Sequence, residues 1–100
     1  MEVLFDKTLK QLENIQCLTP ALKRGNGPDI KRFMLRGTRI GVKLSKINGH
    51  LPVEKITLQW SIKSKRSPRY ELISFEDVLN SNLVSQKYKE ELLFHLDLFA

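Results

Sequence analysis

The chain has 100 residues, 41% of them apolar, and a formal net charge of +6. This size and composition predict a single domain with its own core, and the absence of an apolar run of about 18 residues and of an N-terminal signal sequence argues against membrane insertion and export. The one cysteine, Cys17, excludes an internal disulfide and a thiolate metal cage. We therefore expect a cytoplasmic protein, or one that works in a host cytoplasm or nucleus.

The charges are segregated along the chain. Residues 23–69 contain thirteen Lys or Arg and only two acidic residues, a net charge of +11, whereas the flanks contain four Lys and nine acidic residues, a net charge of −5. Such a split within one small domain predicts a centre that binds a polyanion. The alternative is an ordinary solubilising surface on which the basic residues happen to cluster.

The first element is expected to be an amphipathic helix within residues 1–16. Its apolar residues recur at the spacing of one helix face, with Lys and Glu between them. These apolar residues are Phe5, Leu9, Leu12 and Ile15.

Two short helices are expected next. Thr19 and Pro20 are typical of an N-cap and the first helical position, and they predict one helical turn that ends by residue 24. Pro28 predicts a second short helix, which Gly37 would end. This helix would expose three basic side chains: Lys31, Arg32 and Arg36.

Residues 39–73 predict a three-stranded antiparallel meander. Apolar residues recur at every second position, which is typical of strands buried on one face. They are Ile40, Val42, Leu44, Ile56, Leu58, Trp60, Ile62, Tyr70 and Leu72.

The register of this meander follows from keeping the apolar residues on one face. A three-residue loop at 48–50, or an equivalent bulge near Pro52, would pair Val42 with Ile56. A five-residue turn at 64–68 would pair Trp60 with Leu72. Both connections would therefore be of odd length.

Two helices are expected to complete the chain. Residues 74–77 resemble a capping box, and Ser85 is expected to cap a final helix with one apolar stripe that includes Leu92, Leu96 and Phe99. The predicted fold class is α+β: a three-stranded meander with N-terminal helices and a C-terminal helix packed on one face.

The uncovered face of this sheet is the predicted binding surface. Lys43 would lie opposite Lys55, and Lys63 opposite Arg69, and each such pair of like charges costs roughly 0.2–1 kcal/mol unless an anion neutralises it. The candidate nucleic-acid-binding residues lie on this face, on the short basic helix and in the second turn. They are Lys31, Arg32, Arg36, Arg39, Lys43, Lys55, Gln59, Lys63, Lys65, Arg66 and Arg69.

The expected partner is a nucleic acid, with duplex favoured over single strand. Single strands are commonly bound by exposed aromatic side chains, whereas five aromatic residues here fall in apolar stripes. They are Phe33, Trp60, Tyr70, Tyr88 and Phe99. A polar face of Lys, Thr, Ser and Gln is also what a simple solvated sheet would show.

No motif for catalysis, cofactor binding or metal binding is present. Neither His50 nor His95 has a second ligand at a metal-binding spacing, and there is no nucleophile elbow, Walker motif or dinucleotide fingerprint. We therefore predict no catalytic residue, no cofactor and no metal.

One family resemblance is present near the start of the chain. Residues 4–13, Leu-Phe-x-x-x-Leu-Lys-x-Leu-Glu, followed by helices and a basic antiparallel sheet, resemble the RelE/HigB type of ribosome-dependent ribonuclease toxins. Residues 39–42 do not match the Arg-rich sheet motif of that family, so no catalytic residue is carried over.

The function predicted from the sequence is that of a small non-enzymatic nucleic-acid-binding protein with an accessory or regulatory role. The first alternative is a protein-interaction module, an inhibitor or adaptor of the kind that phages and mobile elements encode. Its basic face would bind an acidic partner, or its acidic helices would bind a basic one. The second is a ribonuclease toxin.

Overall fold

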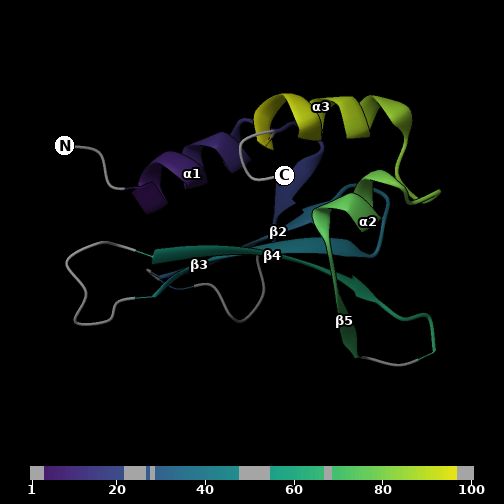
Figure 1. Ribbon diagram of the computed structural model, residues 1–100. Helices are drawn as coiled ribbons and strands as arrows, with labels where there is room; N and C mark the ends of the chain where they lie inside the picture. Colours follow the sequence, from purple (N-terminus) through teal and green to yellow (C-terminus); the bar gives the residue numbers. More distant parts are fainter. Residues whose placement is uncertain (1–3, 22–26, 28, 48–54, 67–68, 97–100) are drawn as a thin grey trace.

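The computed structural model describes residues 4–21, 27, 29–47, 55–66 and 69–96. They form a five-stranded antiparallel sheet whose strands are adjacent in chain order, with helices on one of its faces (Figure 1). The strands are β1 (Leu18–Pro20), β2 (Ile30–Leu35), β3 (Ile40–Ile47), β4 (Lys55–Lys63) and β5 (Tyr70–Ile73). The helices are α1 (Leu4–Glu13), α2 (Phe75–Leu79) and α3 (Gln86–Leu96).

The core lies between the helices and the sheet. Leu12 of α1 and Leu92 of α3 are fully buried there, as are Ile40 and Leu44 of β3. Burying a leucine or isoleucine side chain contributes about 1.5–3 kcal/mol, so these residues explain why the helices cover this face.

The α+β class is confirmed, but the sheet has five strands where three were expected. The short helix expected after Pro28 is wrong, because residues 30–35 form β2 between β1 and β3. Phe33 and Leu35 are buried, two residues apart, as in a strand with one covered face. Gly37 does adopt the left-handed conformation, with φ 73°, but it serves the turn between two strands.

The helical turn expected at Thr19 and Pro20 is also wrong. Both residues belong to β1, where Thr19 lies opposite Met34 and its hydroxyl donates to the Met34 carbonyl oxygen at 3.3 Å. The remainder of that expected turn, residues 22–24, lies outside the described residues. Pro20 is tolerated because β1 is an edge strand, where a missing N–H leaves no ladder partner unpaired.

The predicted pairing of β3 with β4 assigns each residue to the correct face of the sheet, but the partner predicted for each residue is wrong. Val42 lies opposite Trp60, and Leu44 opposite Leu58, so apolar residues still meet on one side. A shift by an even number of residues preserves the faces of a strand, which is why the alternation could not identify the partners. The pairing of Ile47 with Lys55 is incompatible with the expected three-residue loop, whose residues lie outside the described ones.

The predicted register of β5 is wrong by one residue, and this reverses its faces. Trp60 lies opposite Ile73, and Ser61 opposite Leu72, so the connection between β4 and β5 has an even length. Ile73 packs against the core, and Phe75 stacks on Trp60 with ring centroids 5.5 Å apart. Tyr70 is consequently 55% exposed and Leu72 72% exposed.

The C-terminal helices agree with their predicted caps. Ser74 and Asp77 form the capping box, each side chain accepting from the other residue's backbone N–H at 3.0 Å. Ser85 accepts from the Tyr88 N–H at 3.3 Å, as a cap of the final helix should. Leu92 and Leu96 of that helix are buried, whereas Phe99 lies outside the described residues.

One carboxylate ties α3 to the segment before β1. Glu91 Oε2 accepts from the Gln16 N–H at 2.9 Å, and Oε1 accepts from the Cys17 N–H at 3.0 Å. Partial burial acts to raise the pKa of Glu91, but hydrogen bonds from the Cys17 thiol and from these two amides outweigh it, and the pKa is lowered. The charged form of Glu91 therefore stabilises the fold.

We expect Glu91→Gln to lower the free energy of unfolding by about 1 kcal/mol at pH 7, because the amide keeps one acceptor and loses the charge. Since the folded pKa is lowered, the contribution is present above the unfolded value of roughly 4.3 and disappears as the pH falls through the folded pKa. Urea unfolding at pH 7 and pH 3 measures this. Glu90→Gln, which removes the same charge from an exposed position, is the control. An equal loss for Glu91→Gln at both pH values would contradict the prediction.

Candidate functional site

The sheet has one face that the helices leave uncovered, which we call the open face (Figure 1). The strand register assigns to it alternate residues of each strand. Among the described residues these are Thr19, Ile30, Arg32, Met34, Gly41, Lys43, Ser45, Thr57, Gln59, Ser61, Lys63, Tyr70 and Leu72. None of them is acidic, so this part of the open face carries positive charge only.

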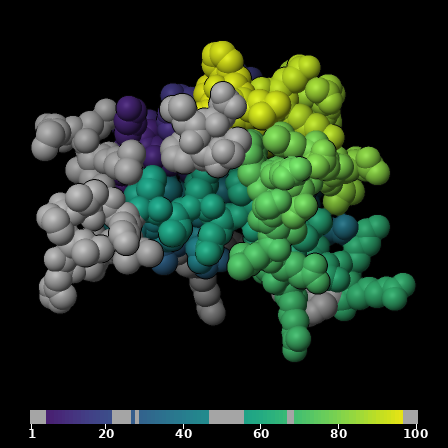
Figure 2. All heavy atoms as spheres, viewed as in Figure 1, coloured from purple at the N-terminus to yellow at the C-terminus, as the bar shows by residue number. Residues whose placement is uncertain are grey.

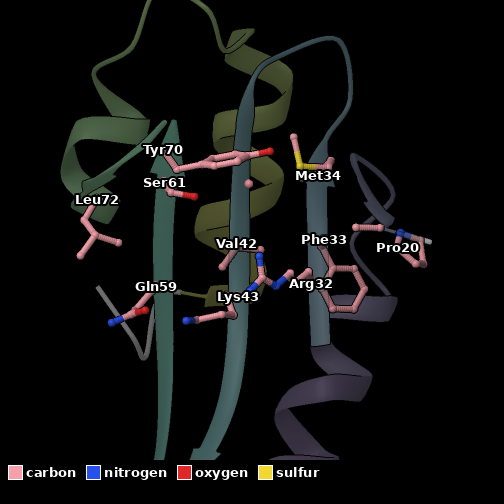
Figure 3. A pocket seen from close by; sticks show the side chains of 12 residues that line it. Pro20, Arg32, Phe33, Met34, Val42, Lys43, Gln59, Ser61, Tyr70 and Leu72 are labelled. Carbon is pink, nitrogen blue, oxygen red and sulfur yellow. The ribbon is translucent and has the colours of Figure 1, made fainter. Parts of the chain in front are cut away.

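Three residues of the predicted site form one row across the open face. Arg32 of β2 lies opposite Lys43 of β3, and Lys43 lies opposite Gln59 of β4. Figure 3 shows the Arg32 side chain reaching from β2 toward β3 and the Lys43 side chain reaching from β3 toward β4. Two cations and an amide are thus held side by side by strand pairing.

The predicted like-charge pairs are wrong, but another one takes their place. Lys43 does not face Lys55, and Lys63 faces Tyr70 where Arg69 was expected. The observed pair is Arg32 with Lys43, which lie directly opposite each other in the β2–β3 pair. The like charges that lie opposite each other are therefore on different residues from those expected.

A hollow of about 610 Å³ lies on the open face next to this row. Arg32, Lys43 and Gln59 line one part of it, and Met34, Tyr70 and Leu72 line another. The site is therefore mixed: cationic and amide groups lie beside an apolar and aromatic surface (Figure 3).

The other predicted site residues are spread around the molecule. Lys31 lies on the helix side of the sheet, half-buried opposite Leu44. Arg36 is exposed after β2, and Arg39 is half-buried before β3, with its Nε buried and lacking a hydrogen-bond partner among the described residues. Lys55 is described only through its strand pairing with Ile47.

The turn between β4 and β5 carries the remaining predicted cations. Lys65, Arg66 and Arg69 are exposed there, and Lys63 is exposed at the end of β4. This end of the hairpin projects from the body of the molecule (Figure 2). Tyr70 lies at the rim of the hollow, and these basic residues extend the positive charge of the open face beyond it.

Sequence reasoning did not place Met34, Tyr70 and Leu72 on the open face, where they line the hollow. Met34 was assigned to a helix, and the β5 residues were assigned to the core. The signal that could have placed β5 is the second apolar alternation, Ile73 and Phe75, which competes with Tyr70 and Leu72. Only the tertiary contact of Phe75 with Trp60 decides between them.

The described residues lack a metal-ligand cluster, and the thiol of Cys17 is protonated near neutral pH. They contain no group of three or more His, Cys, Asp or Glu that could hold a metal ion. Burial, followed by a hydrogen bond to Glu91, raises the pKa of Cys17 to about 12, so this thiol stays protonated near neutral pH.

None of the helices described in residues 4–96 combines the length and apolar character needed to span a membrane.

Comparison of the chain with protein-family models, curated proteins and solved structures found no significant match. The function is therefore proposed from the chemistry of the open face.

Proposed function

We propose that this protein is a small non-enzymatic nucleic-acid-binding protein, with an accessory or regulatory role, that binds its ligand on the open face. The observation that carries the proposal is the row of Arg32, Lys43 and Gln59, in which two cations are held directly opposite each other. A phosphate group at this row could accept charge-assisted hydrogen bonds from both side chains.

The rest of the open face supports the same ligand. Its described residues include no Asp or Glu that would repel phosphate, and small residues, Gly41 and Ser61, lie beside the row. A backbone can approach closely over such small side chains. Lys63, Lys65 and Arg66 add positive charge at the rim, where they would attract a polyanion from solution.

A protein-interaction module is the second candidate, and a separate surface favours it. Leu93 and Phe94 of α3 are 40% and 84% exposed, on the helix layer and not on the open face. Exposed apolar side chains that neighbour each other are typical of protein contacts. An acidic protein could also bind the open face, and the experiment below separates this case.

Binding of labelled single-stranded and duplex DNA and RNA, followed by fluorescence anisotropy across salt concentrations, tests the proposal. We expect the logarithm of the association constant to fall with the logarithm of salt concentration. For roughly three phosphate contacts the slope would be about −2 with a single strand and about −3 with a duplex. Failure of every nucleic acid to bind at low salt would overturn the proposal. Cleavage of the probe, or of message on translating ribosomes, would instead support the ribonuclease alternative.

A further inference from the structure

The hollow on the open face has an aromatic wall. Tyr70 lies on the edge strand β5, is 55% exposed and faces Lys63 across the β4–β5 pair. Figure 3 shows its side chain extending across β3 toward Met34 of β2. The ring thus lies over the sheet, with a face available to a ligand.

Below the Tyr70 ring the sheet surface is formed at Gly41, which has no side chain to fill the hollow. Gly41 lies between Met34 and Ser61 in the sheet, and a Cβ at this position would lie 2.9 Å from the Met34 sulfur. The Met34 thioether therefore occupies the space over the glycine. Tyr70 and Met34 together form an apolar surface of the kind on which a planar ring can pack.

The opposite side of the hollow is polar. Arg32, Lys43 and Gln59 line it, one row of residues away from Met34 and Gly41 along the strands. Neighbouring rows on one face of a strand are about 6.8 Å apart. The hollow, of about 610 Å³, thus joins a stacking surface to a phosphate-binding row within the size range of small-molecule sites.

We propose that this hollow holds one nucleotide of a single strand, with its base stacked on the Tyr70 ring and its phosphate bound by Arg32 and Lys43. The inference rests on the proposed function and names its ligand more closely. The base faces of a duplex are covered by their neighbours, whereas those of a single strand are free to stack on an aromatic side chain. The Gln59 amide can both donate to and accept from a base edge.

This ligand differs from the duplex expected from the sequence. That expectation depended on placing Tyr70, with four other aromatic residues, in an apolar stripe, and the exposure of Tyr70 on the open face removes this premise. The duplex remains the competing ligand in the test.

Anisotropy measurements with a single strand of about ten nucleotides and the matched duplex test the inference on three variants. We expect Tyr70→Leu to weaken single-strand binding about tenfold, because base stacking on an aromatic ring is lost. Tyr70→Phe keeps the ring and is expected to stay within about threefold of the original protein. Phe94→Leu, the same kind of change at an exposed aromatic residue of α3, is expected to have no effect.

An abasic strand identifies stacking as the cause. It should bind the original protein about as weakly as the natural strand binds Tyr70→Leu, and Tyr70→Leu should bind both strands equally. Thermal unfolding confirms that each variant is folded.

The outcomes distinguish this inference from the proposed function. If Tyr70→Leu leaves binding unchanged while Lys43→Gln weakens it, the open face binds nucleic acid without stacking, and the inference is overturned alone. Tighter binding of the duplex than of the single strand would overturn it in the same way. If no nucleic acid binds the original protein, both fail together.

Discussion

Reversing two charges at once, in the variant Arg32→Glu with Lys43→Glu, is expected to lower the affinity for nucleic acid about 100-fold or more at physiological salt. Each substitution replaces a phosphate contact by a repulsion. The stability of the fold should change little, because one pair of like charges replaces another at the same cross-strand positions. Anisotropy and urea unfolding on the same samples measure both quantities.

The single variant Lys43→Glu separates the effect on binding from the effect on stability. It places a carboxylate opposite Arg32, so we expect the free energy of unfolding to stay the same or rise by a few tenths of a kcal/mol while binding weakens. A gain in stability with a loss of binding is what a functional row of like charges predicts.

The control for both variants changes the net charge elsewhere. Lys87→Glu with Lys89→Glu alters α3 by the same total charge. At about 0.15 M salt the screening length is about 8 Å, so charges on the helix layer should affect binding less than threefold. An equal loss of affinity in both double variants would mean that net charge alone drives binding. It would contradict a specific role for Arg32 and Lys43.

The second large effect concerns stability and tests the register of β5. We expect Ile73→Ser to lower the free energy of unfolding by about 1.5–3 kcal/mol, because Ile73 packs against the core. Leu72→Ser should change it by less than about 0.5 kcal/mol, since that side chain is 72% exposed. Urea unfolding followed by the fluorescence of the buried Trp60 measures both variants.

The two serine variants are matched controls for each other, because they remove isomeric side chains from neighbouring positions. The pairing of Trp60 with Leu72 that the alternation predicts requires the reverse order of effects. A larger loss for Leu72→Ser would therefore contradict the observed register.

Elements with a strong local signal were predictable from the sequence. The apolar spacing of α1, the alternation in β3 and β4 and the capping box at Ser74 each depend on neighbours within a few residues, and the structure contains all of them. The strand β2 was not predictable in this way. Its residues Ile30, Phe33 and Met34 also fit one face of a helix, and only pairing with β1 and β3 makes them a strand.

The candidate site was predictable only in part, for the same reason. Lys43 and Gln59 were placed on the open face because the alternation of long strands fixes their faces. Arg32 was selected for its charge but was assigned to a helix. Its position opposite Lys43 in a strand pair was therefore not predicted. Tyr70 was assigned to the core because a strand of four residues fits two registers equally well.

Amide NMR spectra recorded during titration with a single-stranded oligonucleotide test the central claim most directly. If the ligand binds the open face, the amide signals of Arg32, Lys43, Gln59 and Tyr70 will shift together and saturate, while those in the middle of α3 stay in place. Shifts concentrated around Phe94, or no shifts at concentrations that saturate binding, would contradict it.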